Sequence, residues 1–216
     1  YSQSDYNQTV SGSLESYEYS GKSKLIGADL SRVLYRDARR KTTASVGGWY
    51  RESQNYINDT EIEVQRRKTA GWKTSLDHTE YLSAATLSGN VTYKRGTGAF
   101  NAMYAPEEEY GEAYTHVGIV QANASLQVPF KVGQQSLQYL AEWRMQHSQK
   151  PLTPQDRFSI GNRYTVRGFD GEQTLLADNG LLIRNELSGS IPKLPMQWYA
   201  GVDYGEVGGQ TAHEPN

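Results

Sequence analysis

Cysteine is absent from this 216-residue chain, and methionine, with 3 residues, and phenylalanine, with 4, are scarce. Without cysteine the chain has neither disulfides nor thiol chemistry. A run of about 18 apolar residues, the length that crosses a membrane as a helix, is also missing. A hydropathy criterion alone would therefore predict a soluble protein. That prediction is unsafe, because a transmembrane β-barrel places apolar residues only at every second position.

An excess of basic residues is missing too, since 22 Lys and Arg stand against 24 Asp and Glu. Domains that bind nucleic acid usually carry a basic excess, so we expect no nucleic-acid partner. The segment Gly21–Ser23 reads GKS but lacks the upstream glycine of a P-loop. No serine, histidine and acid are spaced as a catalytic triad. We therefore expect no enzymatic activity and no cofactor. We also expect no metal site, because the histidines are not spaced as metal ligands: His78, His116, His147 and His213.

Alternation with a period of two is what the sequence does contain. In 137–146, Leu137, Tyr139, Ala141, Trp143 and Met145 fall on one face, and the opposite face is polar apart from Leu140. Period two predicts β-strands with one apolar and one polar face. The same pattern covers 70–77, 85–94, 120–130 and 196–205, and weaker strands are predicted at 1–8, 24–35, 42–55 and 180–190. We therefore predict an all-β fold of about nine antiparallel strands.

The predicted connections are short and long in turn. Short turns are expected at 36–41, 78–83, 131–135 and 191–195, and longer connections at 9–23, 56–66, 95–115 and 148–179. This asymmetry is typical of outer-membrane β-barrels. Aromatic residues are expected near strand ends, as in the girdles of such barrels: Trp49, Tyr50, Tyr93 and Trp143. A soluble β-sandwich has the same alternation and remains an alternative, although its core should hold more Phe, Leu and Ile.

Two linked motifs resemble a known family. The stretch DRFSIGNRYTVRGFDGEQTLLADNGLLIRNEL (156–187), followed by WYAGVDYG (198–205), is similar to the transporters of two-partner secretion, the TpsB proteins typified by FhaC, ShlB and CdiB. The family pattern is Val-Arg-Gly-Phe/Tyr at the tip of a long loop folded into a barrel, followed by Gly-x-Asp-x-Gly on a later strand. Both motifs are present: Val166, Arg167, Gly168 and Phe169, then Gly201, Asp203 and Gly205.

The resemblance implies a transmembrane antiparallel barrel in the outer membrane of a Gram-negative bacterium. Family members have sixteen strands, preceded by a plug helix and periplasmic POTRA domains. We expect residues 1–216 to resemble the fifth to thirteenth strands, with an inward-folded loop at about 148–179 and no POTRA domain. The implied function is export, without nucleotide, of a large TpsA-type exoprotein such as a haemolysin, an adhesin or a contact-dependent toxin. Outer-membrane lipids and a monomeric barrel are implied too. A passive porin-like channel and a soluble β-rich binding module remain alternatives.

The two motifs also have a physical interpretation. Asp203 falls on the polar face of its strand, so in a barrel it points into the lumen. An arginine on an inward loop can pair with it through a bidentate contact. Gly201 and Gly205 leave that face free of side chains, Gly168 permits a tight turn, and Phe169 could pack against the wall. The alternative is a surface arginine and an unpartnered aspartate. Other charged residues predicted to face the lumen are Lys73, Asp77, Lys94, Glu142, Arg144, Arg184 and Glu186.

Overall fold

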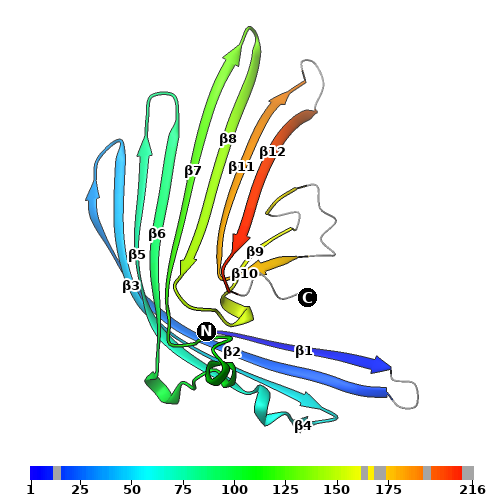
Figure 1. Cartoon of the computed structure of the whole chain (residues 1–216). Helices are drawn as coiled ribbons and strands as arrows, with labels where there is room; N and C mark the ends of the chain where they lie inside the picture. The colour runs from blue at the N-terminus through cyan, green and yellow to red at the C-terminus, as the bar shows by residue number, and fades with distance from the viewer. Residues whose placement is uncertain (12–15, 162–164, 168–173, 192–195, 211–216) are drawn as a thin grey trace.

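Antiparallel strands build almost the whole molecule. A computed structural model describes residues 1–11, 16–161, 165–167, 174–191 and 196–210. Within these residues, nine strands follow one another in the order β1-β2-β3-β5-β6-β7-β8-β11-β12, and the short β4 pairs with β3 beside this path. The sheet is long and strongly curved (Figure 1). The prediction of nine antiparallel strands is confirmed. Among the described residues, no helix is long and apolar enough to cross a membrane.

Each main strand is a long one. Their bounds are β1 Ser2–Ser11, β2 Ser16–Arg36, β3 Arg40–Ile57, β5 Arg67–Tyr81, β6 Thr86–Thr97, β7 Gly118–Val132, β8 Gln135–Ser148, β11 Asn179–Ser190 and β12 Gln197–Gly208. The short elements are β4 Thr60–Glu61, β9 Phe158–Ile160, β10 Leu175–Ala177 and the 3-10 helices η1 Glu63–Gln65, η2 Ala99–Asn101, η3 Pro106–Tyr110 and η4 Pro154–Asp156. β9 and β10 form a separate two-stranded ribbon.

The register keeps the two faces of the sheet distinct from β3 to β12. Leu76 pairs with Val91, Val91 with Ala122, and Ala122 with Met145. One residue further along β5, Asp77 pairs with Asn90, which pairs with Asn123. Because side chains alternate along a strand, the first set shares one face and the second set the other. We call the face with Leu76 the outer face and the face with Asp77 the inner face.

The strand connections differ in length between the two ends of the sheet. At one end, β2–β3, β5–β6 and β7–β8 join through a few residues each, and Asp37 Oδ1 accepts the amide hydrogens of Arg39 and Arg40 at 2.7 Å each. At the other end, 98–117 and 149–178 are long connections. The long loop predicted at 9–23 is wrong, because β1 and β2 pair from Ser2–Leu25 up to Ser11–Ser16. This part of β1 and β2 is mostly polar on both faces, so the sequence shows no alternation there that would predict strands.

The outer face carries the exposed apolar side chains. Leu30, Val46, Leu76, Val91 and Val202 all lie on it and are at least 48% exposed. On β3 and β5 this band is bounded by the ion pairs Arg40–Glu80 and Glu52–Lys68. From Arg40 to Glu52 the strand rises about 40 Å, or about 30 Å along a membrane normal if the strand is tilted as in known barrels. That span accommodates the apolar band of about 25 Å that outer-membrane barrels present to lipid.

One aromatic residue assigned to the girdle lies elsewhere. Trp49 is on the inner face, where Lys94 Nζ stands 4.5 Å from the centre of its ring. The ring lies over Gly71, since a Cβ built there would stand 2.9 Å from Trp49 Cζ2. Tyr50 and Tyr93 are on the outer face near the long-loop end, and Trp143 is on the outer face further along β8. The prediction for Trp49 is therefore wrong. Gly71 on the next strand leaves room for the ring on the inner face.

The buried apolar side chains gather where the 149–178 connection meets the inner face. One cluster joins Val117 and Ile119 to Leu152, which has no exposed surface, with Tyr114 packed against it. The second joins Phe158 and Ile160 of β9 to Leu182 of β11, with Val166 and Val207 at its edge. The largest buried cores of the described residues therefore fix a loop onto the wall. They do not hold two sheets together, as the core of a soluble sandwich does.

Candidate functional site

The base of the 149–178 connection is held by buried polar groups. Asp178, with 2% of its surface exposed, accepts a hydrogen bond from the Leu152 amide at 2.7 Å through Oδ1. Asn179 Oδ1 accepts one from the Ser148 amide at 2.6 Å. These contacts tie the start and the end of the connection to each other. Buried groups paired in this way resist opening, because a separated partner would lose its hydrogen bond without regaining water.

Further along, the loop is attached to the inner wall by charge. Lys94 Nζ on β6 contacts Asp156 Oδ1 at 2.5 Å, and both side chains are about one-fifth exposed. Gln146 on β8 donates from Nε2 to the Asp156 carbonyl at 2.8 Å. The Arg144 guanidinium stands 5.7 Å from the centre of the Phe158 ring. The loop is therefore anchored on β6 and β8 up to the first residue of β9.

Arg167 makes the densest set of contacts. Its Nε donates to Asp203 Oδ2 and its Nη2 to Asp203 Oδ1, each at 2.7 Å. The Arg167 amide also donates to Asp203 Oδ2, at 2.9 Å. The Asp203 side chain is 2% exposed and that of Arg167 is 23% exposed. A planar guanidinium facing a carboxylate through two nitrogens fixes both direction and distance, which an ammonium group does not do.

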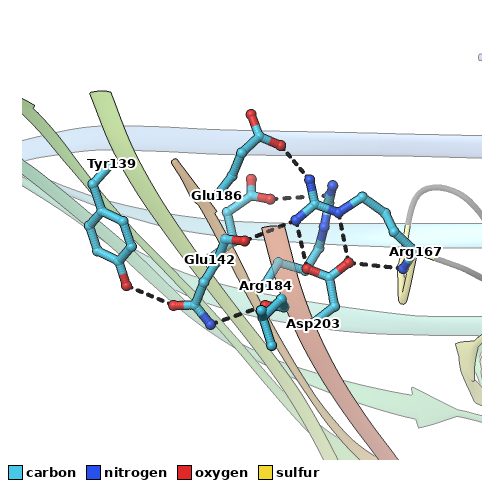
Figure 2. Close-up of polar contacts among 8 residues, drawn as sticks. Tyr139, Glu142, Arg167, Arg184, Glu186 and Asp203 are labelled. Carbon is cyan, nitrogen blue, oxygen red and sulfur yellow. Dashed lines mark hydrogen bonds and ion pairs between the residues drawn. The ribbon is translucent and has the colours of Figure 1, made fainter. Parts of the chain in front are cut away.

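Two further groups on β11 complete the contact. Nη1 of Arg167 donates to Glu186 Oε2, and its Nη2 donates to the Asn185 carbonyl at 3.0 Å. Arg167 therefore bridges β11 and β12, and we call Arg167 with Asp203, Glu186 and the Asn185 carbonyl the arginine latch. Figure 2 shows it beside the neighbouring pair of Arg184 and Glu142, which are 3.2 Å apart.

Hydrogen bonds to Asp203, and then to Glu186, raise the pKa of Arg167 above its ordinary value although burial opposes this. The guanidinium is consequently charged at every pH at which a protein folds. Half-buried charges of this kind are costly to desolvate, so the latch fixes where the loop lies more than it adds net stability. Its chemistry is that of a positioning contact, because none of its members holds a reactive nucleophile.

Two glycines of β12 make the close approach possible. A Cβ built on Gly201 would stand 2.7 Å from Arg167 Cζ and 2.9 Å from the Asn185 carbonyl oxygen. One built on Gly205 would stand 2.6 Å from Val166 Cγ2 and 3.2 Å from Ile160 Cδ1. Side chains at either position would displace the loop. Gly208 on the same strand has nothing within 4 Å of a built Cβ, so the crowding is local to the latch.

The other residues predicted to face the lumen all lie on the inner face. Lys73 contacts Asp29 at 3.0 Å, and Asp77 Oδ1 accepts a hydrogen bond from Asn90 Nδ2 at 2.8 Å. Among the described contacts with the loop, Lys94 and Arg144 contact its base, and Glu186 contacts Arg167. Gly168 and Phe169 lie outside the described residues. Their predicted roles remain predictions.

The sequence did not indicate the contribution of Glu186 to the latch or the packing of Val166 and Ile160 on Gly205. The period of strand β11 places Glu186 on the inner face but cannot say which residue stands opposite. The register that sets Glu186 opposite Gly201, two residues from Asp203, is seen only in the structure.

Comparison with known proteins identifies the fold. The family model for the haemolysin secretion/activation protein ShlB/FhaC/HecB matches residues 1–216. The chain belongs to this family. The outer membrane transporter CdiB-2 of Burkholderia pseudomallei is 31% identical over 209 residues, which is 95% of this chain and 35% of that protein. The hemolysin transporter protein HpmB of Proteus mirabilis is 21% identical over 87% of this chain and 34% of its own length.

Solved structures give the same result. CdiB from Acinetobacter baumannii superposes with a TM-score of 0.84 and 35% identity, over 97% of this chain and 37% of that one. CdiB from Escherichia coli gives a TM-score of 0.81 and 27% identity, over 94% and 38%. The family member described here is an outer-membrane β-barrel protein of a Gram-negative bacterium. The chain spans about a third of the length of the curated relatives that it matches.

Proposed function

We propose that the protein to which this chain belongs exports a large exoprotein across the outer membrane by two-partner secretion, and that the arginine latch keeps its long loop on the inner wall. The observation that carries this proposal is the bidentate contact of Arg167 with the buried Asp203, within a chain of the ShlB/FhaC/HecB family. A passive channel has no need of so closely positioned a contact between a loop and the wall.

The exported chain passes through the barrel unfolded, along a wall of mixed charge. Inner-face Lys73, Asp77, Glu142 and Arg184 keep this wall wet and close to neutral, which suits peptides of any sequence. The sequence has no P-loop, and folding of the exoprotein outside the cell supplies the driving force. The protein acts as a transporter without enzymatic activity or a cofactor. It works as a monomeric barrel surrounded by outer-membrane lipids.

The decisive experiment compares latch variants in the full-length transporter. Arg167→Ala should leave the barrel inserted but reduce secretion by about tenfold or more, because Asp203 is then buried without its partner at a cost of about 3–5 kcal/mol. Asp203→Ala should behave alike, and the double variant should be little worse than either, as expected of two residues in one contact. Arg167→Lys should rescue only part of the activity. The measurement is exoprotein in the medium, normalised to transporter in the membrane.

A matched control is Lys73→Ala, which removes another inner-face cation with a carboxylate partner, on a strand that does not carry the latch. It should leave secretion close to the unmodified level. Normal secretion by Arg167→Ala would exclude the latch. Effects of Arg167→Ala and Asp203→Ala that simply add on the free-energy scale would also exclude it, and would leave the loop as a plug. Absence of any secreted exoprotein from the unmodified strain, with ion conductance retained, would instead support a porin-like channel.

A further inference from the structure

A pocket rich in basic groups lies on the outer face, away from the arginine latch. It is a hollow of about 220 Å³ at the long-loop end of β6, β7 and β8. Its polar lining includes four groups that can carry positive charge: Arg95, His116, His147 and Lys150. We call these four side chains, with Tyr93 and Gly118 beneath them, the basic pocket.

The strand sequences create this hollow. Arg95 of β6 pairs with Gly118 of β7. Val120, the next residue of β7 on the same face, pairs with His147 of β8. Gly118 has no side chain to fill the space, and the Tyr93 ring lies over it, with Cζ at 3.1 Å from a built Cβ. Tyr93 in turn packs on Trp72, their ring centres 5.6 Å apart. A glycine beside an aromatic ring therefore leaves a depression whose rim is basic.

The charges of this pocket are not balanced by protein. None of its nine lining residues is acidic. Within the described part of the chain, neither Arg95 nor Lys150 forms an ion pair with a carboxylate, although Lys150 stands 4.2 Å from the Tyr114 ring centre. By contrast, Lys68 on the outer face of the neighbouring strand β5 is paired with Glu52 at 3.4 Å. Uncompensated cations on the face of a barrel that contacts lipid need an anionic partner from outside the chain.

The histidines fit the same partner. His116 is held by Tyr104, whose ring meets it edge-on at 4.2 Å, and its enclosed Nε2 has no hydrogen-bond partner among the described residues. The N–H of an imidazole can donate a hydrogen bond to a phosphate oxygen. A metal site needs a third ligand, and no group of three candidate ligands occurs among the described residues. The chemistry therefore favours an anion.

The position of the pocket identifies the source of the anion. In outer-membrane barrels the short turns face the periplasm and the long loops face outside. The basic pocket is at the long-loop end, and the apolar outer face begins directly below it with Tyr93, Trp72 and Val120. Aromatic residues at this depth mark the boundary between acyl chains and headgroups. A free anion would gain nothing from this apolar surface, whereas a lipid buries its acyl chains against it.

We propose that the basic pocket binds the phosphate headgroup of an anionic lipid of the outer leaflet, with the acyl chains lying along Tyr93 and Trp72. Arg95 and Lys150 supply the charge-assisted hydrogen bonds, and the exposed His147 supplies a further donor. The volume is below the roughly 300–1,000 Å³ of pockets that enclose a whole small ligand, and it suits a headgroup phosphate. This site serves the lipid contact of the barrel and does not depend on the proposed export function.

The test measures lipid binding to the full-length barrel purified in a neutral detergent. Native mass spectrometry would count bound bisphosphorylated lipid A, with dephosphorylated lipid A and inorganic phosphate as comparison probes. The Arg95→Gln, Lys150→Gln variant should bind the phosphorylated lipid about tenfold or more weakly, since each charge-assisted hydrogen bond is worth about that factor. Binding of the dephosphorylated lipid should be weak and unchanged, and inorganic phosphate should not compete at equal concentration.

The control variant, Lys68→Gln with Arg39→Gln, removes two cations outside the pocket and should bind like the unmodified protein. Heat-modifiable migration on gels establishes that all variants are folded. Equal losses in test and control variants would overturn the proposal, because they would show a general effect of charge. Competition by inorganic phosphate at the concentration of the lipid would overturn it too, since the site would then accept phosphate without acyl chains. A normal secretion level in the pocket variants is compatible with the proposal, and lipid binding alone decides it.

Discussion

The outer and inner faces of the sheet differ in what their side chains contact. Leu30, Val46 and Val202 on the outer face are each more than half exposed. On the inner face Leu182 is 1% exposed, because the loop ribbon covers it, and Asp203 is almost as enclosed. Both faces belong to the same strands, so the difference does not come from secondary structure. Burial therefore follows where the long loop lies, whereas the apolar side chains of the outer face stay exposed.

The two faces also use charge differently. Inner-face ion pairs such as Lys94–Asp156 and Arg167–Asp203 join the wall to the loop across long stretches of sequence. The outer-face pairs Arg40–Glu80 and Glu52–Lys68 join neighbouring strands at the edges of the apolar band. These two inner pairs therefore hold the loop on the wall, whereas the two outer pairs border the apolar band.

Among the changes that test the difference between the faces, the largest effect is expected from placing a charge on the outer face. Leu126 is on the outer face near the middle of β7, and Gln127 beside it is on the inner face. Leu126→Arg should cost about 2–4 kcal/mol of barrel stability, whereas Gln127→Arg should cost much less, because its side chain stays in water. Heat-modifiable barrel content of the full-length variants measures this. Equal effects at the two positions would refute the assignment of faces.

The next effect comes from filling the space under the latch. Gly201→Ala places a methyl group against the Arg167 guanidinium and should weaken loop docking by about 1–3 kcal/mol, through overpacking. Gly208→Ala, on the same strand with open space around it, is the matched control and should have no effect. Protease sensitivity of the 149–178 segment in the folded barrel reports docking. Identical digestion of the two variants would contradict the role given to Gly201.

A smaller effect is expected where the loop base meets β6. Lys94→Met removes one partner of a pair that is about one-fifth exposed on each side, and should loosen the loop by about 1–2 kcal/mol. Asp156→Asn should have a similar effect, and the two together should be less than additive. Amide hydrogen exchange at 150–160 is the measurement. Full additivity would mean that the residues act separately.

The smallest effect should come from the edge of the outer band. The Arg40 side chain is 55% exposed, so Arg40→Ala should change the unfolding free energy by no more than about 0.5 kcal/mol. Urea-induced unfolding in vesicles would measure it. A loss of unfolding free energy as large as the effect expected of Lys94→Met would show that the Arg40–Glu80 pair does more than border the apolar band.

Much of the sheet could be predicted because its information is local. Alternation with a period of two gives strand positions and faces without knowledge of any partner, and the nine strands are present as expected. The alternation fails where both faces are polar, which is why the extension of β1 and β2 through 9–23 was missed. The girdle assignment of Trp49 was wrong for another reason, because it used the position near a strand end and not the parity that puts Trp49 on the face opposite to Tyr50.

Residue parity along one strand is enough to place Asp203 on the inner face with Gly201 and Gly205. Three other features follow from the three-dimensional arrangement alone: the contacts of Arg167 with Glu186 and the Asn185 carbonyl, the packing of Val166 over Gly205, and the burial of Leu152 against Val117 and Ile119. These contacts join segments that are far apart in the chain. Their geometry depends on the curvature of the sheet and the path of the loop, which no local pattern of residues encodes.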